Sequence, residues 1–128
     1  AEGLRVLVVD DNRDAATSMG LLLDVMGLDN RVAFDGASAL DVAGAFLPDV
    51  ALLDIGMPGM DGYALARELR ADPRHRDLLI VALTGWGGEA DRQRTRDAGF
   101  DEHLSKPVDV HALRTLLHEM QGRRRAAA

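Results

Sequence analysis

The chain has 128 residues, a formal net charge of −6 and no cysteine. This length fits one domain whose core can fold without cross-links, and the lack of cysteine excludes disulfides and thiolate metal sites. The negative charge disfavours direct binding to nucleic acid. Because no apolar run approaches the roughly 20 residues that cross a bilayer, we expect no membrane insertion, and a chain without cysteine suits the cytoplasm.

Short apolar runs alternate along the chain with stretches in which apolar residues recur at helical spacing. The runs are typical of buried parallel strands, and the stretches between them are typical of helices that cover a sheet. Gly27 and Pro48 are expected to end the first two helices. The predicted strands are residues 4–9, 31–34, 50–53, 78–83 and 102–105, and the predicted helices are residues 15–26, 40–47, 62–70, 89–98 and 110–120.

Five strand–helix repeats in this order predict an α/β fold with a doubly wound parallel sheet and helices on both faces. No Gly-x-Gly-x-x-Gly motif follows the first strand, which argues against a dinucleotide-binding fold. Five strands fit the flavodoxin-like (βα)5 arrangement with the strand order 2-1-3-4-5. We assign residues 1–122 to this domain and residues 123–128, three Arg and three Ala, to a disordered tail.

Polar side chains follow four of the five predicted strands. Asp10 and Asp11 follow the first strand, Asp54 the third, Thr84 the fourth and Lys106 the fifth. Ligands of such sheets bind beyond the carboxyl ends of the strands, so we expect these groups to converge on one crevice. Three neighbouring carboxylates repel one another unless a cation neutralises them, and a ligand set made of oxygens favours Mg²⁺ or Mn²⁺ over zinc.

Each of these residues taken alone has an ordinary structural explanation. Asp10 and Asp11, with Asn12, could cap the first helix, and Thr84 could belong to a turn. Lys106 could be a solvated surface charge. It is, however, the single lysine among 15 basic residues, and a compact ammonium suits a site with room for one positive charge. The combination at four strand ends, and no single member of it, predicts a site.

The sequence contains the stretches VLVVDDN (6–12), LLDIGMPGMDG (52–62), VALTG (81–85) and AGFDEHLSKPV (98–108). In these stretches the chain resembles the receiver domains of response regulators in two-component phosphorelay systems. Residues 83–108 look most like the receivers of hybrid histidine kinases, and a stand-alone regulator remains the alternative. The resemblance implies a phosphoprotein that works in signal transduction and catalyses only its own phosphorylation and dephosphorylation.

The resemblance also implies roles for the acidic residues. Asp54 would be the phosphoacceptor and would form an aspartyl phosphate. The metal, Mg²⁺ or Mn²⁺, would be bound by Asp54, directly by Asp11, through water by Asp10, and by the backbone carbonyl of Gly56.

Further roles follow for residues near the ends of the last two strands. Thr84 would bind the phosphoryl oxygens, and Lys106 would pair first with Asp54 and then with its phosphate. The bond before Pro107 is expected to be cis, as is usual in receivers. His103 stands where many receivers have an aromatic that changes rotamer together with the threonine, so it is our candidate for the second switch residue. Trp86, two positions after Thr84, is expected to slow hydrolysis of the acyl phosphate.

No histidine lies in these motifs, so the phosphoryl donor would be a sensor histidine kinase or a histidine phosphotransfer protein. His75, His111 and His118 are expected at the surface. The signal would leave through the fourth helix, fifth strand and fifth helix, and a homodimer remains open. Two other functions are alternatives: a degenerate receiver that acts as a scaffold, and a phosphatase of the haloacid-dehalogenase type. The second is disfavoured because Gly56 stands where that family usually has another Asp.

Overall fold

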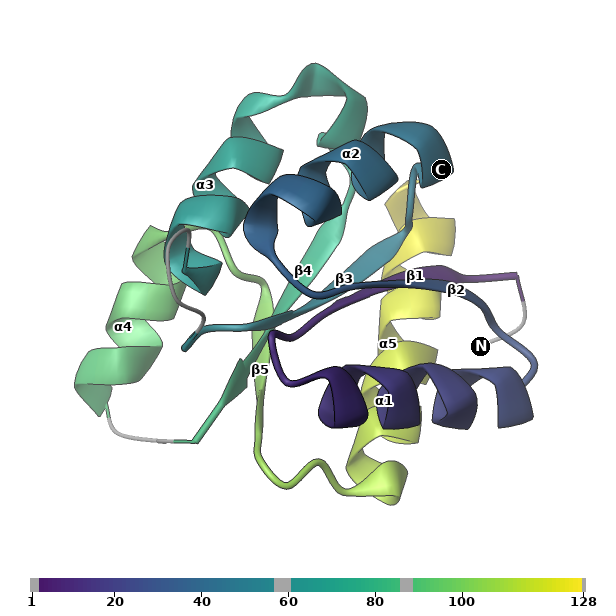
Figure 1. Ribbon diagram of the computed structural model, residues 1–128. Coiled ribbons are helices and arrows are strands. Elements are labelled where there is room, and N and C mark those ends of the chain that lie inside the picture. The colour runs from purple at the N-terminus through teal and green to yellow at the C-terminus, as the bar shows by residue number, and fades with distance from the viewer. Residues whose placement is uncertain (1–2, 57–60, 86–88, 128) are drawn as a thin grey trace.

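The computed structural model describes residues 3–56, 61–85 and 89–127, and these form a five-stranded sheet between two layers of helices (Figure 1). All strand pairs are parallel and the order is β2-β1-β3-β4-β5, which confirms the predicted fold class. The elements are, in chain order, β1 (Arg5–Val9), α1 (Arg13–Val25), β2 (Asp29–Ala33), α2 (Gly36–Phe46), β3 (Val50–Asp54), α3 (Gly62–Ala71), the short 3₁₀ helix η1 (Pro73–His75), β4 (Leu79–Thr84), α4 (Glu89–Asp97), β5 (Glu102–Ser105) and α5 (Val110–Ala127).

The central strand β3 divides the hydrophobic core into two halves. Its side chains alternate between the two faces of the sheet, so Leu53 and Leu52, both fully buried, belong to different clusters. Leu53 packs with residues of α2 and α3, whereas Leu52 packs with residues of α1 and α5. Each buried leucine contributes roughly 1.5–3 kcal/mol, so both faces anchor β3 and hold its carboxyl end in place.

Side chains that precede three helices fix where those helices begin. Asn12, Asp35 and Asp61 are the N-caps of α1, α2 and α3, and each accepts a hydrogen bond from a backbone N–H in the first turn. For Asn12 the donor is the N–H of Ala15, at 3.1 Å. Of the three residues that could cap the first helix, Asn12 is therefore the one that does so. Asp10 is not needed as a cap.

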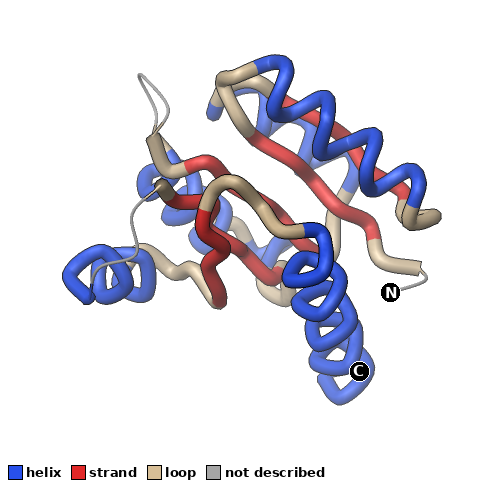
Figure 2. Tube along the Cα trace, turned by 90° about the horizontal axis from the view of Figure 1, so that it is seen from below, coloured by secondary structure: helices blue, strands red, loops and turns tan. Residues whose placement is uncertain are grey.

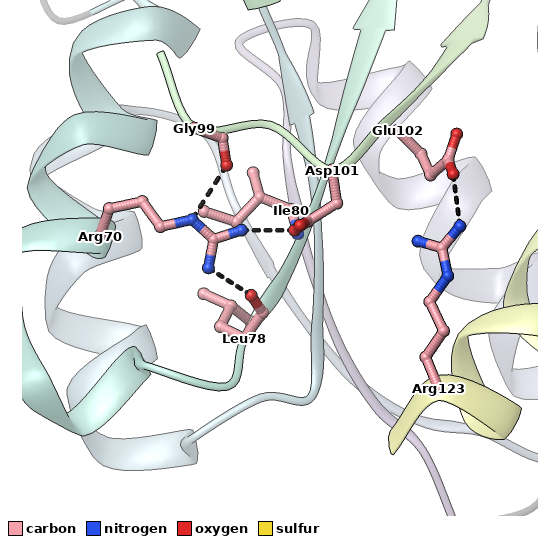
Figure 3. Close-up of polar contacts among 7 residues, drawn as sticks. All are labelled: Arg70, Leu78, Ile80, Gly99, Asp101, Glu102 and Arg123. Carbon is pink, nitrogen blue, oxygen red and sulfur yellow. Dashed lines mark hydrogen bonds and ion pairs between the residues drawn. The ribbon is translucent and has the colours of Figure 1, made fainter. Parts of the chain in front are cut away.

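The last helix is longer than the sequence indicated. We expected a disordered tail from residue 123, whereas α5 continues to Ala127 (Figure 2). Arg123 connects this helix with the sheet, because its guanidinium forms an ion pair with Glu102 of β5 at 2.6 Å (Figure 3). Within the described part of the chain, neither α5 nor any other helix has the length and apolar character needed to cross a membrane.

Arg70 of α3 joins three segments at the edge of the sheet (Figure 3). It donates hydrogen bonds to the carbonyl oxygens of Gly99 (2.9 Å) and Leu78 (2.6 Å) and pairs with the carboxylate of Asp101. The same carboxylate accepts the backbone N–H of Ile80 at 2.7 Å. Gly99 has a φ of +99°, and a Cβ there would lie 2.8 Å from Cγ of Arg70. Arg70 thereby fixes the connection between α4 and β5 against α3 and β4.

Replacing Arg70 by alanine should lower the free energy of unfolding by about 2 kcal/mol, because two backbone carbonyls lose a charged donor and Asp101 loses its cation. The measurement is urea unfolding. Arg67→Ala is the matched control, since Arg67 is an exposed arginine of the same helix. Equal losses of stability in both variants would mean that the effect comes from the helix and that the contacts of Arg70 contribute nothing measurable.

Candidate functional site

The carboxyl ends of β1, β3, β4 and β5 meet at one edge of the sheet. Asp10, Asp54 and Thr84 are buried there, with 3%, 8% and 7% of their surface exposed, whereas Asp11 is exposed. Lys106 directly follows β5, and its backbone N–H donates to the carbonyl of Thr84 at 2.7 Å. The parallel register thus brings together the five side chains that the sequence placed at strand ends, as expected for this sheet.

Three carboxylates form the centre of this group. Asp10, Asp11 and Asp54 each offer one oxygen, and these oxygens all lie within 4.8 Å of one another. Two of the three residues are buried, so solvent screens the repulsion between their negative charges only weakly. Oxygen ligands at this spacing fit a hard divalent cation such as Mg²⁺, which takes few protein carboxylates and keeps several waters.

Lys106 bridges two of the carboxylates. Its Nζ lies 3.1 Å from Oδ2 of Asp10 and 3.2 Å from Oδ1 of Asp54. Burial lowers the pKa of the Lys106 ammonium, but the hydrogen bonds to Asp10 and Asp54 outweigh burial, and the pKa is raised above its ordinary value. Lys106 is therefore a permanent positive charge. The peptide bond between Lys106 and Pro107 is cis, which confirms the expectation from the resemblance.

The two buried carboxylates differ in how their oxygens are used. Asp10 accepts the N–H of Asn12 on Oδ1 at 3.0 Å and contacts Lys106 with Oδ2. Asp54 accepts the N–H of Gly56 and contacts Lys106 with the same oxygen, Oδ1, both at 3.2 Å. Among the described residues, none donates to Oδ2 of Asp54. One oxygen of Asp54, Oδ1, is thus held in place by two donors.

A pocket of about 310 Å³ opens beside Asp54. Most of its lining comes from the strand ends and from the residues that follow them. Two lining residues, Tyr63 of α3 and Arg94 of α4, were not identified from the sequence. Nothing in the sequence pattern marked them, because each belongs to a helix and not to the end of a strand. The lining residues are Asp54, Ile55, Gly56, Tyr63, Leu83, Thr84, Gly85, Arg94 and Lys106.

The two remaining candidates from the sequence have different outcomes. His103 is half-buried on β5, where it pairs in register with Ala82 of β4. It lies on the strand that leads to Lys106, which is compatible with a coupled movement. Trp86 lies outside the described residues.

The family model and the curated relatives that match this chain point to the same protein family. The model described as the response regulator receiver domain matches residues 6–118. The response regulator PleD of Caulobacter vibrioides is 38% identical over 105 residues, which are 82% of this chain and 23% of that protein. The response regulator MprA of Mycobacterium avium is 38% identical over 118 residues, which are 92% of this chain and 50% of that protein. The chain thus spans at most half the length of these curated relatives.

Solved structures agree with this result. The receiver domain of a sensor histidine kinase from Pseudomonas aeruginosa PAO1, which has a magnesium ion coordinated in its active site cleft, matches with a TM-score of 0.85 and 32% identity. That match covers 94% of this chain and 98% of the other. The chemotaxis protein CheY4 of Vibrio cholerae matches with a TM-score of 0.87 and 26% identity over 91% of this chain and 98% of the other. With the family model, the fold and the carboxylate cluster in agreement, this chain belongs to the response regulator receiver domains of two-component signalling.

Proposed function

We propose that this receiver accepts a phosphoryl group on Asp54 from a phosphohistidine of a sensor histidine kinase or histidine phosphotransfer protein, with a divalent cation bound. The observation that supports this most directly is the arrangement of Asp54. The residue is buried, one carboxylate oxygen is held by Lys106 and the N–H of Gly56, and the residue lines a pocket large enough for a phosphoryl group.

The chemistry asks the protein mainly for position and charge. Oδ2 of Asp54 attacks phosphorus, the P–N bond of the phosphohistidine breaks, and its electron pair returns to the imidazole nitrogen of the donor. Lys106 balances the charge that builds on the phosphoryl oxygens, and Thr84 donates a hydrogen bond to one of them. The product is an acyl phosphate, and attack by water releases inorganic phosphate and restores Asp54.

The carboxylate cluster supports a cation site. Asp10, Asp11, Asp54 and the carbonyl of Gly56 would hold Mg²⁺ or Mn²⁺, with Asp10 acting through water. When bound, the ion supplies positive charge to the phosphoryl oxygens during transfer. Without the ion, Lys106 is the one positively charged residue among the site residues of the sequence motifs, and it faces three negative carboxylates.

The signal would leave through α4, β5 and α5. A phosphoryl group adds about −1.5 to −2 charges and three acceptors, which attract the Thr84 hydroxyl at the start of the loop that leads to α4. His103 would follow Thr84 by changing rotamer on β5. We take residues 1–122 as the unit needed for this function, because Met120 is the last buried residue of the described part of α5.

Incubation with acetyl phosphate and Mg²⁺ should increase the intact mass by one phosphoryl group, about 80 Da. The same incubation with a chelator should give no increase, because the transfer needs the cation. A mass increase that persists in chelator would contradict the metal assignment. If acetyl phosphate does not modify the chain, the receiver either accepts only from its own kinase or is a scaffold, and a phosphohistidine donor is the next reagent.

A further inference from the structure

Arg94 lies on α4 but lines the same pocket as Asp54, Thr84 and Lys106. Its guanidinium carbon sits 4.1 Å from the centroid of the Tyr63 ring, so the planar group stacks on the face of that ring. Stacking of this kind is worth about 0.5–2 kcal/mol and orients the arginine without using its N–H donors.

The platform on which Arg94 rests is rigid and adjoins Asp54. Tyr63 is 6% exposed, and its ring contacts the ring of Phe100 edge to face, with 6.2 Å between centroids and an angle of 86°. The preceding residue, Gly62, packs so tightly on β3 that a Cβ there would lie 2.6 Å from the carbonyl oxygen of Asp54. The position of Tyr63 relative to Asp54 is therefore fixed, and the guanidinium of Arg94, an exposed residue, lies over its ring.

The charge balance of the pocket favours a second cation. Three carboxylates lie together at this site, and the ammonium of Lys106 contacts two of them. Phosphorylation of Asp54 adds further negative charge. Among the side chains that the structure describes, none forms a hydrogen bond or ion pair with Arg94.

We propose that Arg94 is a phosphoryl-binding residue: it stacks on Tyr63 and donates hydrogen bonds from the edge of its guanidinium to the oxygens of a phosphoryl group on Asp54. The flat face of the guanidinium stays on the ring while the edge donates, and its fork matches two phosphoryl oxygens. This inference rests on the proposed function, because it requires phosphorylation of Asp54. It adds a contact through which α4 itself responds to the phosphoryl group.

Arg94 lies in the last turn of α4, next to the connection that leads to β5. Gly99 and Asp101, which follow this helix, are held by Arg70 of α3. A new bond at Arg94 therefore acts close to the end of α4 that Arg70 already anchors.

Beryllofluoride, which imitates a phosphoryl group on an aspartate, tests the proposal in the presence of saturating Mg²⁺. Its affinity can be measured by ¹⁹F NMR or calorimetry for the wild type, Arg94→Gln, Arg94→Lys and Arg96→Gln. Loss of the guanidinium in Arg94→Gln should weaken binding about tenfold. Arg94→Lys should keep the charge, lose the fork and weaken binding about threefold. Arg96→Gln is the matched control, since Arg96 is exposed on the same helix, and it should bind like the wild type.

Titration with Mg²⁺ alone separates phosphoryl binding from damage to the fold. Arg94→Gln should bind Mg²⁺ as tightly as the wild type or more tightly, because the variant has lost a positive charge from the pocket. Beryllofluoride affinity within twofold of the wild type, or a parallel loss of Mg²⁺ and beryllofluoride affinity, would overturn the role of Arg94. If the wild type binds no beryllofluoride, or Asp54→Asn binds it equally well, the proposed function fails and the role of Arg94 fails with it.

Discussion

Asp54→Asn should abolish the mass increase on incubation with acetyl phosphate and Mg²⁺. An amide in place of the carboxylate cannot attack phosphorus, and the other carboxylates of the site are differently placed. Asp10 is already engaged through both oxygens, and Asp11 is exposed. Asp41→Asn is the matched control, because Asp41 is an exposed carboxylate of α2, and this variant should be phosphorylated like the wild type. A mass increase in Asp54→Asn would move the phosphoacceptor to another residue.

The same variant should respond less to Mg²⁺. It removes one of three carboxylates whose oxygens lie within 4.8 Å of one another, so repulsion falls and a ligand is lost. Thermal unfolding should show a smaller rise in Tm on addition of Mg²⁺ than in the wild type. The dissociation constant for Mg²⁺ should be about tenfold larger. An unchanged rise in Tm would mean that Asp54 does not bind the ion.

Gly62→Ala should lower the free energy of unfolding by about 3 kcal/mol, which is among the larger effects expected of a single methyl group. The new Cβ would lie 2.6 Å from the carbonyl oxygen of Asp54 and 2.7 Å from Cα of Ile55. Both are backbone atoms, so relief requires that β3 and α3 separate. Gly62 also donates its N–H to the carbonyl of Ile55 at 3.1 Å, and this bond would lengthen.

Gly122→Ala is the control for the backbone effect of replacing glycine. This residue lies in α5, and a Cβ there would have no neighbour within 4 Å. Alanine should therefore stabilise the helix by about 0.5–1 kcal/mol. Chemical unfolding of both variants checks the pair, and a Gly62→Ala protein as stable as the wild type would contradict the close approach of α3 to Asp54.

The features that the sequence predicted well are those that repeat or that sit at strand ends. Apolar runs of the right length predicted β1, β3 and β4, whereas β2 and β5 were predicted from weaker patterns and β2 begins two residues earlier than expected. The order of the sheet is confirmed. The start of α2 was predicted four residues late, at 40, because the periodic residues begin after the capping residue Asp35. The side chains after the strands were found because one topological rule brings them together.

The features that were missed depend on single contacts in space. Arg94 reaches the pocket only because α4 packs beside α3, and nothing near it in the chain marks this. His75 was expected at the surface but is 3% exposed, and burial lowers its pKa. One buried histidine in a short 3₁₀ helix leaves no periodic pattern. Contacts of this kind require the packed structure.

The bond between Asp10 and Lys106 joins residues that are 96 positions apart in the chain. During synthesis on the ribosome, Asp10, Asp11 and Asp54 emerge long before Lys106, and closing so long a loop is slow compared with forming a local helix. The three aspartates therefore meet their lysine only when β5 has joined the sheet. A nascent or truncated chain that ends before β5 has Asp54 but lacks Lys106. If Asp54 accepts the phosphoryl group as proposed, reactivity toward phosphoryl donors would therefore report that the whole domain has been completed.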